Sequence, residues 1–490
     1  LDGGTLPADA LTEYGSDDFG YAPPLPTKQY YSFAGWEPEN IPDESTGNVS
    51  FTAKWTQDVL GSIQYNLDGG TMSGEKTEYT SSDFGYVPPT PTKIDYKFIG
   101  WEPAQIPTDS TGEITFAAQW VESRAELLSG REINVKMKKL AGNRSASYYS
   151  EDTAITAIQR SEEVPSDTVM ADANSLISTN TSGKPVYAWF DNGVIKWWSE
   201  AVYVYAGSDL SRLCHSMWKL ASISGLADWN TDNVTDMSCM FESCIQLTDL
   251  APLANWQTGK VTNMSEMFYD CKQIISLLPL ENWKTNKVTN MKNMFINCAQ
   301  LTDLVGLEKW DTSSVNNMFE IFGGCNHLTN VSALANWNVN NVTNMYAMFM
   351  GCRKLADLSP LINWQTGNVT DMNSMFYNCN SIVDLTLLTN WNTGNVTDMG
   401  SMFYNCNSIV DLTPLTNWNT GNVINMSSMF YGCSQLTEVS AINDWNIAKV
   451  YFSKIRGNYF SHMFGGCPSH PTFTKRAGTW DSNGTFTPTT

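Results

Sequence analysis

The sequence predicts an α+β protein in which a solenoid of 27-residue strand–helix repeats follows two small, mainly β modules. Tryptophans recur at a constant spacing of 27 residues from Trp229 to Trp445, and cysteines keep the same spacing from Cys244 to Cys433. A different unit, residues 1–55, recurs at residues 67–120. A fixed period of this length is typical of an array in which each repeat forms one turn of a stack.

The two N-terminal modules can be aligned on their tryptophans, since Trp36 and Trp55 match Trp101 and Trp120. Alternating stretches such as "GSIQYNL" and "EITFAAQW", separated by Gly-Gly, Pro-Pro and "DSTG", predict short strands joined by turns. The second module has "GSIQYN" ahead of the shared Leu-Asp-Gly-Gly, whereas the first begins at Leu1. We therefore expect either more chain upstream or an unsatisfied sheet edge in the first module.

The motifs "YNLDGGT", "PPTPTK", "YKFIGW" and "ITFAAQW" resemble the Listeria–Bacteroides surface repeat of the B-repeat type. This resemblance implies a β-grasp-like fold and an extracellular spacer role. We assign residues 1–57 to the first module, whose first strand is missing, and residues 58–122 to the second.

Residues 123–225 are predicted to cap the start of the array, because a stack needs its first apolar face covered. The segment "YAWFDNGVIKWW" predicts a hairpin around Asp191-Asn192-Gly193. Its tryptophans Trp189, Trp197 and Trp198 would contribute to the cap. The alternative is that they form an exposed carbohydrate-binding platform.

Each repeat is predicted to contain a short helix. Met399, Met402, Phe403 and Cys406 fall at positions i, i+3, i+4 and i+7, one stripe of a helix of about two turns. Asp398, just before the stripe, is a good N-cap. A copper or heme site is disfavoured because stacking would spread the methionines along a column. The recurring cysteines are expected to be free, buried thiols.

After the predicted helix, the "IVDL" of "SIVDLTPLTNW" (408–418) is the expected strand. A strand, a helix and an Asn-Trp corner per repeat are typical of leucine-rich repeats. We expect the asparagines before the tryptophans to form a buried amide ladder. These residues are Asn255, Asn282, Asn336, Asn363, Asn390 and Asn417.

The motifs "NVTDMSCMFESC", "NVTDMNSMFYNC" and "LTPLTNW" resemble the BspA-like leucine-rich repeats of bacterial surface proteins. The resemblance implies a secreted or wall-attached adhesion protein that binds matrix proteins, host cells or other microbes. We assign residues 226–450 to these repeats. Cys467 follows Cys433 by 34 residues instead of 27, so residues 451–490 are predicted to be a C-terminal cap.

Composition excludes several classes of function. The formal net charge of −21 opposes binding to nucleic acid, and no apolar run is long enough for membrane insertion. The four histidines, His215, His327, His462 and His470, follow no known ligand spacing, and catalytic motifs are missing. We therefore expect no enzyme activity.

One column of polar residues on the predicted strands is the candidate partner-binding strip. Its carboxylates, about 4.7–4.9 Å apart if strands stack in register, would repel one another without a compensating group. A basic partner or a cation such as calcium would compensate; otherwise no cofactor is expected. The alternative is that each carboxylate hydrogen-bonds a nearby turn. The candidate site residues are Asp249, Asp303, Asp357, Asp384, Asp411 and Glu438, with Ser276 and Asn330 at equivalent positions.

Two functions are compatible with these observations. The first is an extracellular or cell-surface adhesin whose solenoid binds a host or microbial surface protein or a glycan. The second is a structural subunit of an extracellular assembly, in which self-association replaces an external ligand.

Overall fold

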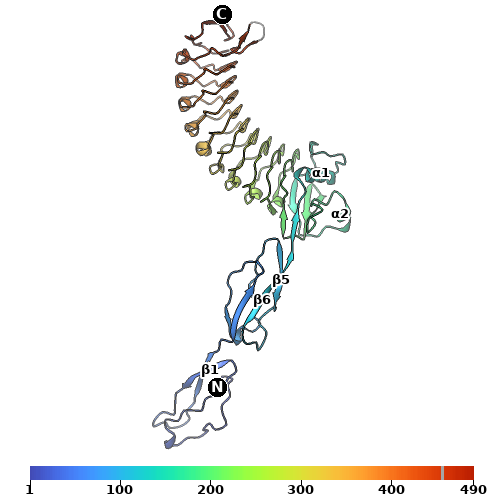
Figure 1. Ribbon diagram of the computed structural model, residues 1–490, viewed down its shortest axis with the longest axis vertical. Helices are drawn as coiled ribbons and strands as arrows, with labels where there is room; N and C mark the ends of the chain where they lie inside the picture. Colours follow the sequence, from blue (N-terminus) through green and yellow to red (C-terminus); the bar gives the residue numbers. More distant parts are fainter. Residues whose placement is uncertain (454–456, 490) are drawn as a thin grey trace. The chain divides into compact units, whose positions relative to one another are not determined.

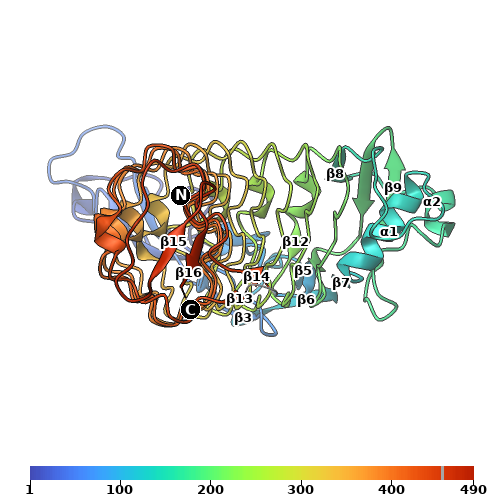
Figure 2. The ribbon, with the colours of Figure 1, turned by 90° about the horizontal axis from the view of Figure 1, so that it is seen from above.

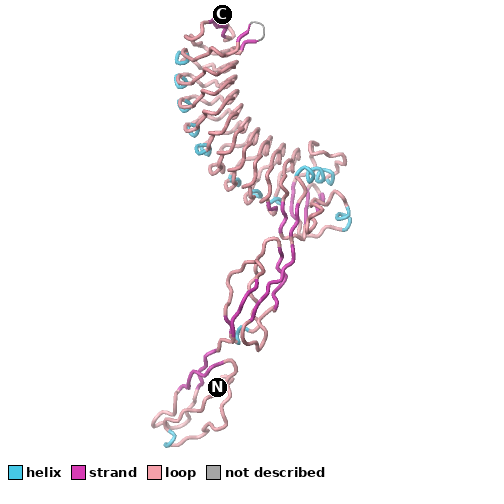
Figure 3. The backbone as a smooth tube through the Cα atoms, in the orientation of Figure 1, coloured by secondary structure: helices cyan, strands magenta, loops and turns pink. Residues whose placement is uncertain are grey.

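The computed structural model describes residues 1–453 and 457–489, and the chain divides into two compact units, Leu1–Ser123 and Arg124–Thr490. The predicted fold class is wrong. The described residues contain two α-helices, α1 (Gly130–Leu140) and α2 (Asp167–Ala171), and both precede the 27-residue repeats. The remaining regular structure consists of small sheets and short 3₁₀ turns, so a strand–helix leucine-rich-repeat solenoid is not supported (Figure 3).

The first unit contains both N-terminal modules and no α-helix, so the β-grasp-like expectation is not supported either. The first module has one antiparallel pair, and the second has a four-stranded sheet in the order β4-β3-β6-β5 (Figure 1). One 3₁₀ turn lies in each module. The elements are η1 (Ser16–Asp18), β1 (Tyr31–Glu37), β2 (Thr52–Gln57), β3 (Gly61–Asn66), β4 (Glu78–Tyr79), η2 (Ser81–Asp83), β5 (Tyr96–Glu102) and β6 (Ile114–Glu122).

Strand β3 makes the difference between the cores of the two modules. It pairs in parallel with β6 and places Ile63 in a core where Phe116 is fully buried. In the first module, the equivalent Phe51 is half-buried and, with Trp36 and Tyr14, lines a cavity of about 180 Å³. The second module therefore has a filled core at the place where the first has this cavity.

The second unit begins with two three-stranded sheets, ordered β8-β10-β9 and β12-β11-β7. The predicted hairpin is confirmed, since Asp191 and Val194 are paired at its turn. Trp197 is buried and its Nε1 donates to the carbonyl of Gly225, whereas Trp189 and Trp198 are half-buried. The strands are β7 (Arg124–Glu126), β8 (Ala157–Arg160), β9 (Tyr187–Asp191), β10 (Val194–Trp198), β11 (Tyr203–Tyr205) and β12 (Trp229–Asn230).

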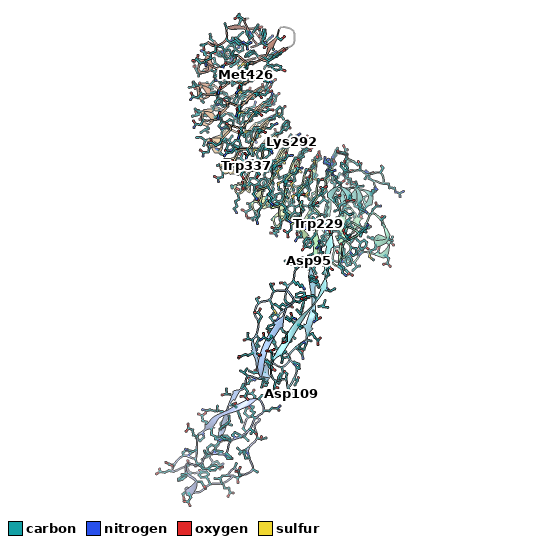
Figure 4. All side chains as sticks on the ribbon, viewed as in Figure 1. Asp95, Asp109, Trp229, Lys292, Trp337 and Met426 are labelled. Carbon is teal, nitrogen blue, oxygen red and sulfur yellow. The ribbon has the colours of Figure 1, made fainter. Side chains whose placement is uncertain are left out.

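The 27-residue repeats form coils that stack with like side chains against like. Phe376 and Phe403 lie with ring centroids 5.7 Å apart and planes 11° from parallel, and Trp418 and Trp445 repeat this at 6.4 Å and 3°. Figure 4 labels Trp229 and Trp337, two members of the tryptophan column. Every phenylalanine of the column from Phe241 to Phe430 is fully buried. The repeats thus share one continuous core.

The helix predicted in each repeat is wrong because alternate backbone N–H groups of this segment bond to the next coil, and the others close short turns within their own coil. Ser401 and Asn405 have positive φ angles of 53° and 55°, which an α-helix does not allow. The Ser401 N–H donates to the carbonyl of Ser427 (2.8 Å), and the Phe403 N–H to that of Met429 (2.9 Å). The apolar stripe is buried as expected, but by a chain of turns.

The strand predicted at "IVDL" is also wrong. In its place there is at most an isolated bridge, such as Asp411 with Glu438, and a 3₁₀ turn follows. The asparagines before the tryptophans are exposed, so the buried amide ladder expected there is wrong as well. The 3₁₀ turns are η3 (Ser224–Leu226), η4 (Ala251–Leu253), η5 (Leu278–Leu280), η6 (Ser332–Asn336), η7 (Ser359–Leu361), η8 (Thr386–Leu388), η9 (Thr413–Leu415) and η10 (Ser440–Ile442).

All eleven cysteines are free and ten of them are buried, which confirms the prediction for the eight that recur. They also have a polar role. The Cys406 thiol donates to the carbonyl of Phe376 in the preceding coil (3.0 Å), and the equivalent bond recurs along the column. Burial raises the pKa of the Cys406 thiol far above its ordinary value. The thiols therefore stay protonated and fill both a packing and a donor position.

Along the segment equivalent to Met399–Asn405, alternate N–H groups of each coil donate to the next coil, so the matching carbonyl groups of the first coil have no preceding coil to bond them. Helix α1 covers them. The Gly130 N–H donates to the carbonyl of Asp209, and Asn134 Nδ2 and the fully buried Lys138 Nζ donate to the carbonyl of His215 (3.2 and 2.7 Å). A side chain at Gly130 would collide with the backbone of the first coil, which explains the glycine.

The opposite end has N–H groups without a following coil, and the C-terminal segment accepts from them. The Phe464 N–H donates to the carbonyl of Gly484, and the His462 N–H to Thr485 Oγ1. Figure 2 shows this segment and α1 at opposite ends of the array. Phe460 takes the position of the first methionine in the last coil, since Met426 bonds to Tyr459. The last strands are β13 (Phe452–Ser453), β14 (Gly457–Asn458), β15 (Gly478–Trp480) and β16 (Phe486–Pro488).

Candidate binding surface

The predicted carboxylate strip lies on the outside of the array, at one position per coil, and each member except Asp303 lies two residues before a 3₁₀ turn. Asp303 and Asp411 are half-buried, and the other members are exposed. The structure pairs Asp411 with Glu438 and Asp303 with Asn330 through backbone bridges between neighbouring coils. The exposed members are Asp249, Asp357, Asp384 and Glu438.

Five carboxylates of the strip accept a backbone hydrogen bond from the residue two positions later. Asp384 Oδ1 accepts from the Thr386 N–H (2.7 Å), and Asp411 Oδ1 from the Thr413 N–H (2.7 Å). Hydrogen bonds from Thr386 hold the pKa of Asp384 below its usual range. Asp249, Asp303 and Asp357 make the same bond. These side chains therefore stabilise the turn that follows them.

Exposed aliphatic side chains accompany the carboxylates. Val383 is 58 % exposed and Val410 42 % exposed, and each directly precedes an aspartate of the strip. In an earlier coil, Ile275 is 63 % exposed at the equivalent position. The surface thus pairs negative charge with apolar contact area, which is the chemistry that a basic and partly apolar partner requires.

The strip does not assemble a metal centre of three or more ligands. Within residues 1–453 and 457–489, its carboxylates form no group of three whose oxygen atoms all lie within 4.8 Å of one another. Calcium usually takes six to eight oxygen ligands. The calcium alternative would therefore need oxygen atoms from water or from a partner.

A tyrosine ladder near the end of the array was missed by the sequence reasoning. Tyr377, Tyr404 and Tyr431 are half-buried and stack in successive coils, with ring centroids 4.4 and 4.7 Å apart. The signal was present in "FYNC" and "FYGC", which repeat the tyrosine after the buried phenylalanine. The stacked faces cover one another, so the edges and hydroxyl groups are what this surface presents.

An Asn-x-Thr triplet recurs in several coils, and its asparagine has a structural role in the array. Asn395 Nδ2 donates to the carbonyl of Gly367 in the preceding coil (2.7 Å), and Asn368 and Asn341 make equivalent bonds. Their recurrence therefore follows from the stacking of the coils.

Comparison with known families identifies both repeat types. A family model described as "Mycoplasma protein of unknown function, DUF285" matches residues 208–306, 275–384, 302–410 and 384–485, which together cover more than half of the chain. The Listeria-Bacteroides repeat domain matches residues 62–124, which confirms that resemblance for the second module. The DUF285 description does not mention BspA or leucine-rich repeats.

Neither the curated proteins nor the solved structures include a match to this chain. Among the described residues, no helix has the length and apolar character that crossing a membrane requires. The protein is a repeat protein with a Listeria-Bacteroides repeat domain ahead of its array. By the extent of the match over residues 208–485, the chain belongs to the DUF285 family.

Proposed function

We propose that this chain is an extracellular, cell-surface attached binding protein without catalytic activity. Its array recognises a host or microbial surface protein or a glycan, and its N-terminal modules act as spacers. The two repeat families support a surface location, and the resemblance to BspA-like proteins supports adhesion. The observation that carries the proposal is the strip of carboxylates and exposed aliphatic side chains on the array.

The chemistry of the strip favours a protein partner with lysine or arginine side chains beside apolar ones. Asp384, Asp411 and Glu438 lie in three successive coils and keep their charges in water, where a rim of opposite charge accelerates association. The net charge of −21 adds a long-range attraction for basic surfaces. Binding should therefore weaken as ionic strength rises.

A capture experiment with the full chain tests this proposal. The purified protein is applied to arrays of extracellular-matrix proteins and glycans, and any captured partner is titrated against the triple variant Asp384→Asn, Asp411→Asn, Glu438→Gln. Asparagine can still accept the turn hydrogen bond, so the variant removes charge and keeps the backbone. We expect at least a tenfold loss of affinity, caused mainly by slower association.

The matched control removes three charges elsewhere on the array, through Asp232→Asn, Glu308→Gln and Asp311→Asn. An equal loss in both variants would reduce the effect to net charge and contradict a role for the strip. An array without any captured protein or glycan would contradict the binding function itself.

The alternative function is a structural subunit of an extracellular assembly. Both ends of the array are covered by the chain's own segments, so joining arrays end to end would first require a cap to leave. A concentration series in light scattering distinguishes the two functions. Ordered polymers would support the assembly, and a concentration-independent monomer would support the binding protein.

A further inference from the structure

The first coils of the array carry a cluster of side chains that no other part of the described chain repeats. One column of residues, spaced 27 positions apart, contains Ser401 near the end of the array. At the beginning of the array, the same column contains Arg212, Cys239, Glu266 and Asn293. The column that contains Tyr404 begins with His215 and Glu242. Because coils stack in register, residues 27 positions apart become neighbours, and ligand-type side chains gather here.

Three of these side chains converge. The ligand atoms of Cys239, Glu242 and Glu266 all lie within 4.8 Å of one another, and no other such group of three occurs among the described residues. Cys239 Sγ lies 3.3 Å from Glu266 Oε2, and Cys239 is 4 % exposed. Glu242 Oε2 lies 3.2 Å from His215 Nε2, which is itself buried.

The backbone holds this arrangement in place. Cys239 and Glu266 both have positive φ angles, 54° and 59°, fixed by N–H bonds to the next coil. The Cys239 N–H donates to the carbonyl of Ser265 and the Glu266 N–H to that of Lys292. The site is therefore set by the same ladder that builds every coil, with little freedom for the Cα positions.

A second observation points to a missing ligand. Asn293, which is only 9 % exposed, donates through Nδ2 to Glu266 Oε1 (3.3 Å), while its buried Oδ1 has no hydrogen-bond partner among the described residues. Buried polar atoms are nearly always paired, so an unpaired oxygen beside the cluster marks an incomplete polar site.

We propose that Cys239, Glu242 and Glu266 bind a divalent transition-metal ion, with zinc as the best match. A thiolate and two carboxylates fit zinc, whereas calcium and magnesium take oxygen ligands only. His215 orients Glu242 by its hydrogen bond, the usual role of a residue behind a ligand. The sequence did not point to this site because Cys239 lies outside the recurring cysteine column from Cys244 to Cys433.

Charge balance also fits. The ion displaces the thiol proton to solvent, and the sulfur lone pair forms the bond to the metal, so the ligands carry three negative charges in the bound state. The divalent ion contributes two positive charges, and the guanidinium of Arg212 adds a third to the surroundings of the site. Arg212 lies nearby, with its Cζ 5.5 Å from the ring centroids of both Tyr148 and Tyr149.

Burial, followed by the neighbouring Glu242 carboxylate, raises the pKa of the Cys239 thiol far above its ordinary value. In Glu242 burial acts to raise the pKa, but hydrogen bonding, first from His215, outweighs this and the pKa is lowered.

Titration of the metal-stripped full chain with Co²⁺ tests the site, because a cysteine ligand gives a thiolate-to-cobalt charge-transfer band. We expect one equivalent to bind, Zn²⁺ to displace it, and the band to be lost in Cys239→Ser. Glu266→Gln and Glu242→Gln should weaken binding at least about tenfold.

Glu320→Gln is the matched control, since Glu320 occupies the same column two coils beyond Glu266. It should leave cobalt binding unchanged. Circular dichroism of each variant checks that the array is folded. A full chain that shows no charge-transfer band, or a band that persists in Cys239→Ser, would overturn the proposal. This experiment is independent of the binding function proposed above, because it needs no macromolecular partner.

Discussion

The chain contains two kinds of internal duplication, and they solve the problem of a small core in different ways. Each N-terminal module has its own core, and the second closes it with β3 around Phe116. A 27-residue coil has no core of its own, because Phe376 is covered by Phe349 and Phe403 of the neighbouring coils. A module can thus fold or fail by itself, whereas a coil depends on its neighbours.

Alkaline pH should destabilise the array far more than the N-terminal modules, and this is the largest expected effect. The modules contain no cysteine, and ten thiols in the second unit have a pKa raised above the reference value of 9.0, nine of them first by burial and that of Cys433 first by a hydrogen bond with Cys467. Above pH 9 the unfolded thiols lose protons that the folded ones retain, so stability falls as pH rises. At pH 10 each thiol costs about 1.4 kcal/mol, and the ten together cost about 14 kcal/mol, near the upper end of the roughly 5–15 kcal/mol of a typical domain.

Pulse proteolysis at pH 7, 9 and 10, with the fragments mapped by mass spectrometry, checks this expectation. The array should become cleavable between pH 9 and 10 while the modules stay protected. Cys379→Ala combined with Cys406→Ala should reduce the alkaline loss. Array and modules that become cleavable at the same pH would contradict the prediction.

A cavity in the middle of the array should destabilise several coils at once. Phe349 is fully buried between Phe322 and Phe376, with ring centroids 5.9 and 5.8 Å away. Phe349→Ala should lower the free energy of unfolding by about 3–5 kcal/mol. Hydrogen exchange should show reduced protection on both sides of the variant coil, and an effect confined to residues 340–360 would contradict shared cores.

The matched phenylalanines of the modules offer a local comparison. Phe116→Ala removes a fully buried ring and should cost about 3–5 kcal/mol. Phe51→Ala removes a half-buried ring beside an existing cavity and should cost about 1 kcal/mol. Hydrogen exchange restricted to peptides from residues 1–123 measures both, and equal costs would contradict a core role for β3.

Removal of the buried lysine should open the array at its first coil. Lys138→Met removes the donor to the carbonyl of Tyr148 and one of the two donors to that of His215, at a cost of about 1–3 kcal/mol. Burial lowers the pKa of Lys138 to about 8, so above pH 8 the folded lysine loses its proton before the unfolded one and this group adds stability.

The difference between wild type and Lys138→Met in urea unfolding should therefore grow from pH 8 to pH 9. Subtracting the two curves removes the common contribution of the thiols. A difference that stays constant with pH would show that Lys138 does not titrate in this range.

The smallest effect is expected at the strip. Asp384→Ala removes the acceptor for the Thr386 N–H on the surface and should cost about 0.5–1 kcal/mol, whereas Asp384→Asn should cost less. Thermal melting of both variants checks this. Equal destabilisation by the two substitutions would show that the loss of the charge, and not the loss of the turn hydrogen bond, lowers the stability.

The sequence predicted side-chain burial better than backbone conformation. The 27-residue period correctly placed Phe403 and Cys406 in a column, because any stack in register hides like residues together. The spacing of Met399, Met402 and Phe403 also fits a helix, and nothing in that pattern reveals that Ser401 and Asn405 adopt left-handed angles. Hydrogen bonds to the next coil decide between a helix and a chain of turns, and the sequence of a single repeat does not reveal these bonds.

The site could be predicted only where it recurs. Asp384 and Asp411 were found because a carboxylate returns at this position in most coils. Cys239, Glu242 and Glu266 come together once, through differences between successive repeats. A comparison of columns, read 27 residues apart along the chain, would have found them.

The ladder of N–H groups that donate to the next coil has a consequence for how such a protein can change its length. Along this ladder, helix α1 meets carbonyl groups and the C-terminal segment meets N–H groups, whatever the number of coils between them. Insertion or loss of whole 27-residue units would leave both junctions chemically matched. Gene duplication within the array can therefore alter the reach of the protein in steps, without any new terminus having to arise.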